Sequence, residues 1–459
     1  MRINKIIIII LIILICSLTC AGKEIKDIYP NTDADMTEVI SGSVNYTADM
    51  TLENCIKIAL GNNPEILSAF EDILINDSKI KQIWSNYFPE ISWQTSWSHI
   101  KQLQLSDAFN YNLEYEYYIL GQISLQQLLY DFGVTQNQAT IQRLGYESAK
   151  KTFASVVNDV IYKTKTAYYE LLYSYEAEKV AQMNVDNYQT FYNQAQALYS
   201  IGFNPKIDVT IAQVNLSKAK MGLISAKNLI NTATAKLNNA MGVPYIEKYN
   251  IQGELDYEPL DISFADTIKF AIKSRPELKK SEINVEKARQ NVKLVKKSYF
   301  PQIEFDGAYQ EGGKHWTSNN GWQIGLYLNF PIINGAKTYN QIKEAKYLYD
   351  KELANAKKIQ NNIYLEIQTS YLKLHEKENQ LPVAAAQVKQ AIENYELSKG
   401  RYRVGEASPI EMREAQNTLA DSKLQYFKSL YEFNNAKAEL EKNIGMNLNT
   451  NTKFLGITK

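Results

Sequence analysis

The sequence predicts an α+β fold in which one half-protein, a β-hairpin followed by long helices, is built twice. The chain repeats itself: residues 51–67 read TLENCIKIALGNNPEIL, and residues 263–278 read SFADTIKFAIKSRPEL. Each half contains a stretch in which apolar and polar residues alternate, which is typical of strands. Each half also contains a long stretch with helical periodicity and hardly any glycine or proline. Together these observations predict a duplicated fold whose two halves act as one assembly.

The duplication keeps a nearly constant spacing along the chain. Matching prolines lie 212 residues apart, and matching glycines near the end of each half lie 203 apart. If Gly133 is aligned with Gly335, the first half is 10 residues longer between Pro89 and Gly133. We expect that excess in a length-tolerant loop. The first repeat then covers residues 51–250 and the second covers 251–447.

The two ends of the chain differ from the repeats. Residues 1–22 carry two positive charges, a short apolar run and small residues, which predicts a secretory signal peptide. The apolar run is shorter than the roughly 20 residues of a transmembrane helix. Cys20 leaves lipidation open, because the residues before it differ from those of a lipoprotein signal. Residues 23–50 are expected to form a polar arm, and residues 448–459 a C-terminal tail.

The composition excludes several classes of function. Fifty basic and 50 acidic residues cancel, so no basic stripe suggests a nucleic-acid partner. The mature chain has no stretch suited to a transmembrane helix, so it would meet a membrane only as a β-barrel or as a surface-bound element. The sequence lacks a P-loop and a nucleophile elbow, and it has only three histidines. We therefore expect neither an enzyme nor a cofactor nor a resident metal.

Two hairpins are predicted, at residues 91–127 and 303–330. One face of the first carries residues such as Ile91, Trp93 and Trp97, and the opposite face carries serine and glutamine. Strands of about 10 residues with this alternation are typical of outer-membrane barrels, with the apolar side toward lipid. A half-buried sheet of a soluble domain would show the same pattern, so each hairpin alone leaves both interpretations open.

Each hairpin is followed by a long helix and a return helix. The long helices are expected at residues 134–201 and 336–404, with a kink or short break at Pro382 in the second. The return helices are expected at residues 207–241 and 409–444. At 1.5 Å per residue a long helix would reach roughly 100 Å, which favours a role in spanning a distance.

This pattern resembles the TolC family of outer-membrane efflux and secretion channels. The segments that carry the resemblance include YFPEIS, LLYDFG and YSIGFNPKIDVTIAQ in the first half, and YFPQIEF, LNFPIINGAKT and YRVGEASPIEMREAQNTL in the second. The resemblance implies a homotrimer in the outer membrane. Its subunits would give four strands each to one 12-stranded β-barrel, continued by a long α-helical barrel in the periplasm.

The resemblance also implies a function and partners. The protein would be the exit duct of a tripartite efflux pump, with a periplasmic adaptor and an inner-membrane transporter of the RND or ABC type. An exit duct for type I protein secretion is the main alternative. A periplasmic coiled-coil adaptor is an alternative of another class, although adaptors lack two aromatic hairpins.

A periplasmic gate is implied where the long helices turn back. Glu411 and Glu414 lie one helical turn apart and would form an acidic ring that favours cations and binds blocking divalent ions. Tyr402 matches a tyrosine that latches the closed tip in the family. The family's latching arginine corresponds to Ala407 here, so Arg401, Arg403 or Arg413 would have to replace it. Gate residues on this interpretation are Glu411, Glu414, Tyr402, Arg403 and Asp208, with Tyr199 and Asn204 as further first-half counterparts.

The same turns are where the resemblance would dock an adaptor. The docking residues are expected at the two loop tips: Gly202, Phe203, Asn204, Gly405, Glu406 and Ala407.

Overall fold

The computed structural model describes residues 50–104, 111–203, 205–243, 251–260, 262–313, 319–404 and 406–445. The expected signal peptide, most of the N-terminal arm and the C-terminal tail lie outside these residues. The chain divides into two compact units. We call residues 72–150 and 280–357 the sheet unit. The rest of the described chain, residues 50–71, 151–279 and 358–445, is the helical unit.

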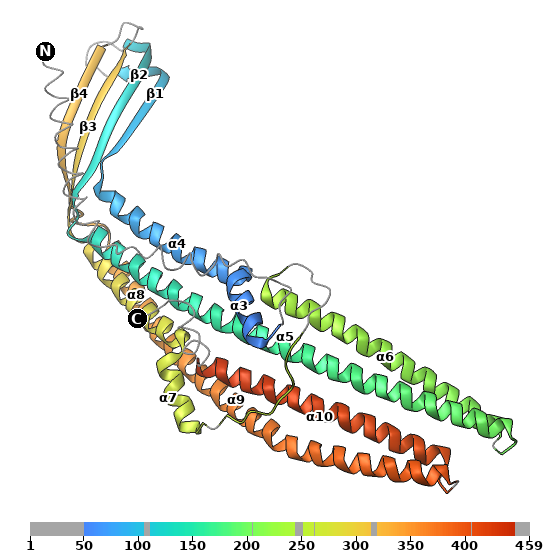
Figure 1. Cartoon of the computed structure of the whole chain (residues 1–459). Helices are drawn as coiled ribbons and strands as arrows, with labels where there is room; N and C mark the ends of the chain where they lie inside the picture. The colour runs from blue at the N-terminus through green and yellow to red at the C-terminus, as the bar shows by residue number, and fades with distance from the viewer. Residues whose placement is uncertain are drawn as a thin grey trace. The chain divides into compact units, whose positions relative to one another are not determined.

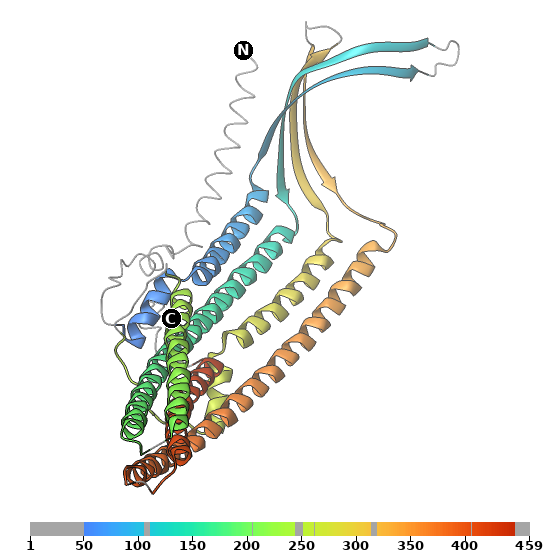
Figure 2. The same cartoon turned by 90° about the vertical axis from the view of Figure 1, so that its right-hand side faces the viewer.

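The sheet unit contains one antiparallel sheet with the strand order β1-β2-β3-β4 (Figure 2). The strands are β1 (Glu90–Gln104), β2 (Tyr111–Tyr130), β3 (Gln302–Gly313) and β4 (Asn319–Asn329). Each predicted hairpin is therefore present, and the two join through β2 and β3. Within the described residues β1 pairs only with β2, and β4 only with β3. Both outer strands keep one edge of backbone hydrogen-bonding groups unpaired.

One face of this sheet exposes large apolar side chains. Trp93 pairs in register with Ile123, and Tyr309 pairs with Trp322. These side chains are mostly exposed, with Trp93 at 69% and Trp322 at 67%. Ser92 precedes Trp93 on β1, so its side chain points to the opposite face, where its hydroxyl lies 2.7 Å from that of Ser124 on β2. A contiguous exposed apolar face of this kind indicates a surface that contacts another protein or a membrane.

The structure corrects the length difference between the two halves. Phe132 and Gly133 both have positive φ angles, and so do Gly335 and Ala336. Gly133 therefore corresponds to Ala336, at the spacing of 203, and the first half is nine residues longer rather than 10. The expected loop insertion is also wrong in kind. β1 and β2 have 15 and 20 residues against 12 and 11 in β3 and β4, so the excess mainly extends the first hairpin's strands.

The helices occur in the same order in both halves (Figure 1). Those of the first half are α3 (Leu52–Asn62), α4 (Pro64–Trp84), α5 (Val134–Ser200) and α6 (Lys206–Met241); a short 3-10 helix, η1 (Ser85–Tyr87), follows α4. Those of the second half are α7 (Phe264–Ser274), α8 (Pro276–Lys297), α9 (Lys337–Arg403) and α10 (Pro409–Ile444). The side chains of Thr51 and Ser263 cap α3 and α7 as acceptors from backbone N–H groups. Of the two outcomes predicted at Pro382, a kink or a short break, the break is absent, because α9 continues through the proline.

Glycine ends both return helices for a steric reason. Gly242 and Gly445 follow α6 and α10 with φ angles of 68° and 72°, in the left-handed region. A Cβ atom at Gly242 would lie 2.6 Å from the carbonyl oxygen of Asn62. Glycine is thus needed there both for its backbone conformation and for the close approach of α6 to α3.

The helical unit is held together by a core drawn from both halves. Its fully buried side chains include Cys55 from α3, Ile161 and Leu171 from α5, Leu237 from α6, Ile367 from α9, and Phe433 and Leu440 from α10. Burial raises the pKa of the Cys55 thiol to about 12, so it packs as a small apolar group. Among the described residues, no helix is both long and apolar enough to cross a membrane.

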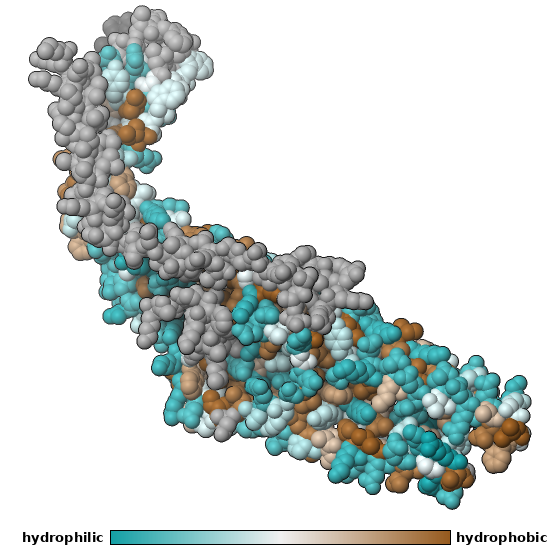
Figure 3. All heavy atoms as spheres, in the orientation of Figure 1, coloured by the Kyte–Doolittle hydropathy of each residue, from teal (hydrophilic) through white to brown (hydrophobic). Residues whose placement is uncertain are grey.

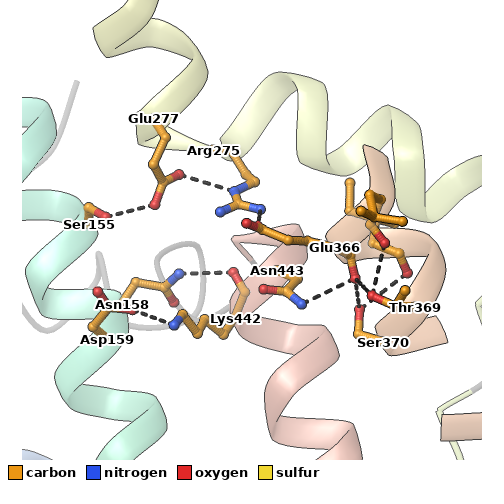
Figure 4. A network of polar contacts seen from close by, with 12 residues as sticks. Ser155, Asn158, Asp159, Arg275, Glu277, Glu366, Thr369, Ser370, Lys442 and Asn443 are labelled. Carbon is orange, nitrogen blue, oxygen red and sulfur yellow. Dashed lines mark hydrogen bonds and ion pairs between the residues drawn. The ribbon is translucent and has the colours of Figure 1, made fainter. Parts of the chain in front are cut away.

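A charged network crosses this unit where α8 begins (Figure 4). Arg275, only 6% exposed, precedes α8; its guanidinium lies 3.1 Å from the carboxylate of Glu277 and 2.6 Å from that of Glu366 on α9. Ser155 on α5 donates to the other oxygen of Glu277 at 2.7 Å. Burial would lower the pKa of Arg275, but the two carboxylates outweigh it and raise that pKa. The network therefore links α5, α8 and α9 through one buried cation.

Candidate functional site

The turn from α5 to α6 is closed by backbone hydrogen bonds and presents apolar side chains. Gly202 has a φ angle of +78°, and its N–H donates to the carbonyl of Tyr199 at 3.0 Å. Ile201 and Phe203 are 75% and 74% exposed. Figure 3 shows apolar surface gathered at this turn. Asn204, one of the predicted tip residues, lies outside the described residues.

The turn from α9 to α10 is built around a helix cap. The hydroxyl of Ser408 accepts from the N–H of Glu411 at 3.2 Å, which fixes the start of α10. The N–H of Glu406 donates back to the carbonyl of Arg401 at 2.9 Å. Gly405 lies outside the described residues. The carboxylate of Glu411 contacts Arg401 at the end of α9.

Arg401 bridges this turn. Its guanidinium contacts the carboxylate of Glu411 at 2.5 Å and donates to the carbonyl of Glu406 at 3.3 Å. One side chain therefore holds the end of α9, the turn and the first turn of α10. Of the three arginines considered from the sequence, Arg401 makes this contact, whereas Arg403 is exposed with no ion pair among the described residues. Both partners are about half exposed, so the pair contributes at most about 1 kcal/mol.

Tyr402 packs against α5 within its own subunit. Its ring lies 5.3 Å from that of Phe191 on α5, and the residue is only 9% exposed. Its hydroxyl is buried with no hydrogen-bond partner in the described part of the chain. Burial raises the pKa of Tyr402, and the charge of Asp208 adds to that shift. Ala407, where the resemblance would put an arginine, packs into the same apolar cluster.

The two predicted gate glutamates lie in different electrostatic surroundings. Glu411 is compensated by Arg401, whereas Glu414 is exposed and lies beside a groove that Arg413 also lines. The described residues contain no group of three or more histidine, cysteine, aspartate or glutamate side chains arranged to hold a metal ion. Within one subunit, therefore, the free negative charge of the pair is that of Glu414.

The groove beside Glu414 was not predicted from the sequence. It has a volume of about 670 Å³ and is bordered by α5, α6 and α10. Across it, the hydroxyl of Tyr188 donates to the side-chain oxygen of Asn417 at 2.8 Å. The amide nitrogen of Asn215 is buried in its wall without a partner among the described residues. The available signal was the run of small residues on α6, including Ala219, Gly222, Ser225 and Ala226.

The sequence matches the family model described as "Outer membrane efflux protein" over residues 55–243 and 267–446. The chain therefore belongs to the outer membrane efflux protein family. The predicted family and outer-membrane location are confirmed, and so is the expectation that the chain is not an enzyme. The alternative of a periplasmic adaptor protein is set aside by the same match.

Characterised relatives are distant but extend over much of the chain. The toxin and drug export protein A of Aggregatibacter actinomycetemcomitans is 24% identical over 303 residues, which are 64% of each chain. The outer membrane protein TolC of Escherichia coli K12 is 18% identical over 417 residues, which cover 86% of this chain and 82% of TolC.

Solved structures show the same fold. The Campylobacter jejuni CmeC outer membrane channel superposes with a TM-score of 0.75 at 17% identity, over 94% of this chain and 96% of CmeC. The Neisseria gonorrhoeae MtrE outer membrane channel, solved in its open state, gives a TM-score of 0.70 at 16% identity, over 88% of this chain and 96% of MtrE. The α+β channel fold predicted from the sequence is thus confirmed.

Proposed function

We propose that this protein is the outer-membrane exit duct of a tripartite efflux pump and works as a homotrimer. The observation that carries the proposal is the sheet of four strands with two unpaired edges and an exposed apolar face. An unpaired edge cannot be left in lipid, because its N–H and C=O groups would lack hydrogen bonds. Copies of the chain remove these edges by pairing β4 of one with β1 of the next. Three copies give a closed barrel of 12 strands.

The helices supply the periplasmic part of the duct. In a closed ring, the α5–α6 and α9–α10 hairpins of each copy line a tunnel that ends at their turns. The apolar side chains of Ile201 and Phe203 support the docking of a periplasmic adaptor at these turns. An inner-membrane transporter, of the RND or ABC type, drives the cargo. The chain itself makes and breaks no covalent bond.

Type I protein secretion is the second candidate function. It is favoured by the relative whose name joins toxin and drug export. A duct of this kind carries either cargo, because its transporter selects what enters.

A deletion strain tests the proposed function. Loss of the chain should raise the intracellular accumulation of a fluorescent efflux substrate severalfold, and the restored gene should reverse it. Unchanged accumulation together with loss of a secreted protein would favour the secretion duct instead. If neither changes and the protein is recovered as a soluble monomer, the duct proposal is wrong.

A further inference from the structure

The internal repeat identifies a surface of the sheet unit that lacks its expected neighbour. Figure 2 shows the helices of this unit side by side in the order α4, α5, α8, α9. Helix α8, from the second half, packs against α5, from the first half. By the repeat, α4 corresponds to α8 and α9 corresponds to α5. The packing of α8 on α5 therefore maps to a packing of α4 on α9. Within one copy of the chain, α4 does not lie against α9.

The contacts between α8 and α5 define how such a pair packs. The side-chain amide of Asn137 donates to the carbonyl of Gln290 at 2.9 Å. The hydroxyl of Ser148 donates to the side-chain oxygen of Asn284 at 3.4 Å. Gly145 lies in the sequence between these two contacts and is buried between α4 and α8. A Cβ atom added there would lie 3.4 Å from the side-chain oxygen of Asn76 on α4 and 3.9 Å from the Nζ of Lys287 on α8.

The repeat spacings convert each contact into a pair on α4 and α9. The spacing is 203 residues from α5 to α9 and 212 from α4 to α8. The contact between Ser148 and Asn284 maps to Lys351 and Asp72. The position of Gly145 opposite Lys287 maps to Leu348 opposite Ile75. The members of each mapped pair are complementary. Basic Lys351 would face acidic Asp72, and apolar Leu348 would face apolar Ile75.

The exposure of side chains on α9 and α4 agrees with the absence of a neighbouring helix. Gly145 is buried, but its counterpart Leu348 is 44% exposed, and Ile75 is 49% exposed. Asp72 and Lys351 are exposed, and neither side chain has an ion-pair partner among the described residues. The surface of α9 also carries a hollow of about 460 Å³, lined by Asn340, Lys343, Glu344, Tyr347, Leu348 and Lys351.

We infer that α4 of one copy of the chain packs on α9 of the next copy, in the register with which α8 packs on α5 inside one copy. Asp72 and Lys351 then form an ion pair between copies, beside an apolar contact between Ile75 and Leu348. The inference rests on the proposed homotrimer and deepens it by assigning the residues that meet. A second copy fits because it supplies both the complementary charge and the apolar partner.

Cross-linking of cysteine pairs tests the register. Asp72→Cys with Lys351→Cys, treated with a short bifunctional maleimide in isolated membranes, should shift more than half of the protein to dimer and trimer bands on a denaturing gel. The control is Ser148→Cys with Asn284→Cys, which should cross-link inside one chain and keep the monomer mass. Native Cys55 is fully buried, and the unsubstituted chain shows any background from the native cysteines.

Charge reversal gives an independent measurement. Asp72→Lys should lower the trimer fraction in detergent severalfold, and adding Lys351→Asp should restore it. If native mass spectrometry finds a trimer but the 72–351 pair stays monomeric while the control cross-links, the inferred register is wrong and the homotrimer stands. If the unsubstituted chain is not a trimer, the proposed function itself fails.

Discussion

Arg275 pairs with Glu366 at 2.6 Å, and the equivalent positions in the first half hold Asn63 and Lys163. In that first half, Lys163 pairs directly with Glu65 at 2.7 Å, and Glu65 is the counterpart of Glu277. The second half has an acid where the first has a lysine, and an arginine where the first has an asparagine. The two repeats thus neutralise the equivalent glutamate with different cations: Lys163 on α5 in the first half, and Arg275, just before α8, in the second.

This difference between the two halves predicts that one substitution destabilises the protein and that a second restores most of the lost stability. Arg275→Asn should destabilise the protein by about 2–3 kcal/mol, because it leaves Glu277 partly buried and faced by Glu366. Adding Glu366→Lys should recover most of that loss, since it rebuilds the arrangement of Asn63, Glu65 and Lys163. The thermal midpoint of the detergent-solubilised protein measures both. A double variant no more stable than Arg275→Asn would show that the two halves are not electrostatically equivalent here.

The contact of Arg401 with Glu411 is expected to stabilise the conformation of the α9–α10 turn. Arg401→Ala should shift the equilibrium away from that conformation by up to about five-fold, the equivalent of an exposed ion pair. If this turn forms the proposed gate, single-channel recordings in planar bilayers would show a changed frequency of open events. Arg403→Ala is the matched control, because that side chain is exposed and unpaired among the described residues. Equal effects of the two variants would count against Arg401 as the bridging residue.

An acidic ring at the tip, as predicted from the sequence, would depend more on Glu414 than on Glu411. Arg401 neutralises Glu411, so Glu411→Gln removes a charge that is already compensated. Glu414→Gln removes an exposed charge and should reduce cation selectivity and divalent block more strongly. Reversal potentials across a salt gradient measure selectivity, and titration with a divalent cation measures block. Unchanged selectivity in the double variant would reject an acidic ring at these positions.

Tyr402 is predicted to act through its ring. Tyr402→Phe removes a buried hydroxyl that has no partner in the described chain, so stability should change by less than about 1 kcal/mol. Tyr402→Ala leaves a cavity beside Phe191 and should cost about 3 kcal/mol. Bilayer conductance and thermal midpoints of both variants separate the roles. A leaky Tyr402→Phe channel would mean that the hydroxyl does latch the tip.

Asp131 predicts a pH dependence at the start of α5. Its carboxylate accepts from the N–H groups of Gly133 at 3.0 Å and Thr135 at 2.5 Å. Burial would raise the pKa of Asp131, but the hydrogen bonds from Thr135, Tyr87 and Gly133 outweigh it and lower that pKa below the usual value for an aspartate. The stabilisation is therefore complete above about pH 4 and is lost as the pH falls through the lower folded value. The stability gap to Asp131→Asn should shrink between pH 6 and pH 3, and a constant gap would contradict this.

The sequence predicted the parts of the fold that periodicity encodes. Alternation marked strands near residues 91 and 303, and the structure begins them at Glu90 and Gln302. The glycine-bounded turns put return helices at 207–241 and 409–444, close to α6 (Lys206–Met241) and α10 (Pro409–Ile444). Such elements are local, so residue type and spacing suffice to find them.

The parts that failed depend on geometry that spacing does not contain. Aligning glycine with glycine at positions 133 and 335 was wrong by one residue, because Ala336 adopts the left-handed conformation of Gly133. The sequence left a kink or a short break open at Pro382, and α9 continues through the proline without a break. Arg401 was one of three candidate arginines, and only the direction of its side chain distinguished it. The groove lined by Asn215 is formed by three helices, and the small residues of α6 do not by themselves indicate it.

The mass of the intact assembly is the most direct test of the proposed homotrimer with a closed barrel. The full chain, expressed with its natural export route and extracted from the outer-membrane fraction in mild detergent, can be weighed by native mass spectrometry. We expect one species of three mature chains, because three copies close the unpaired edges of β1 and β4. A monomer that stays folded in the soluble periplasmic fraction would contradict it.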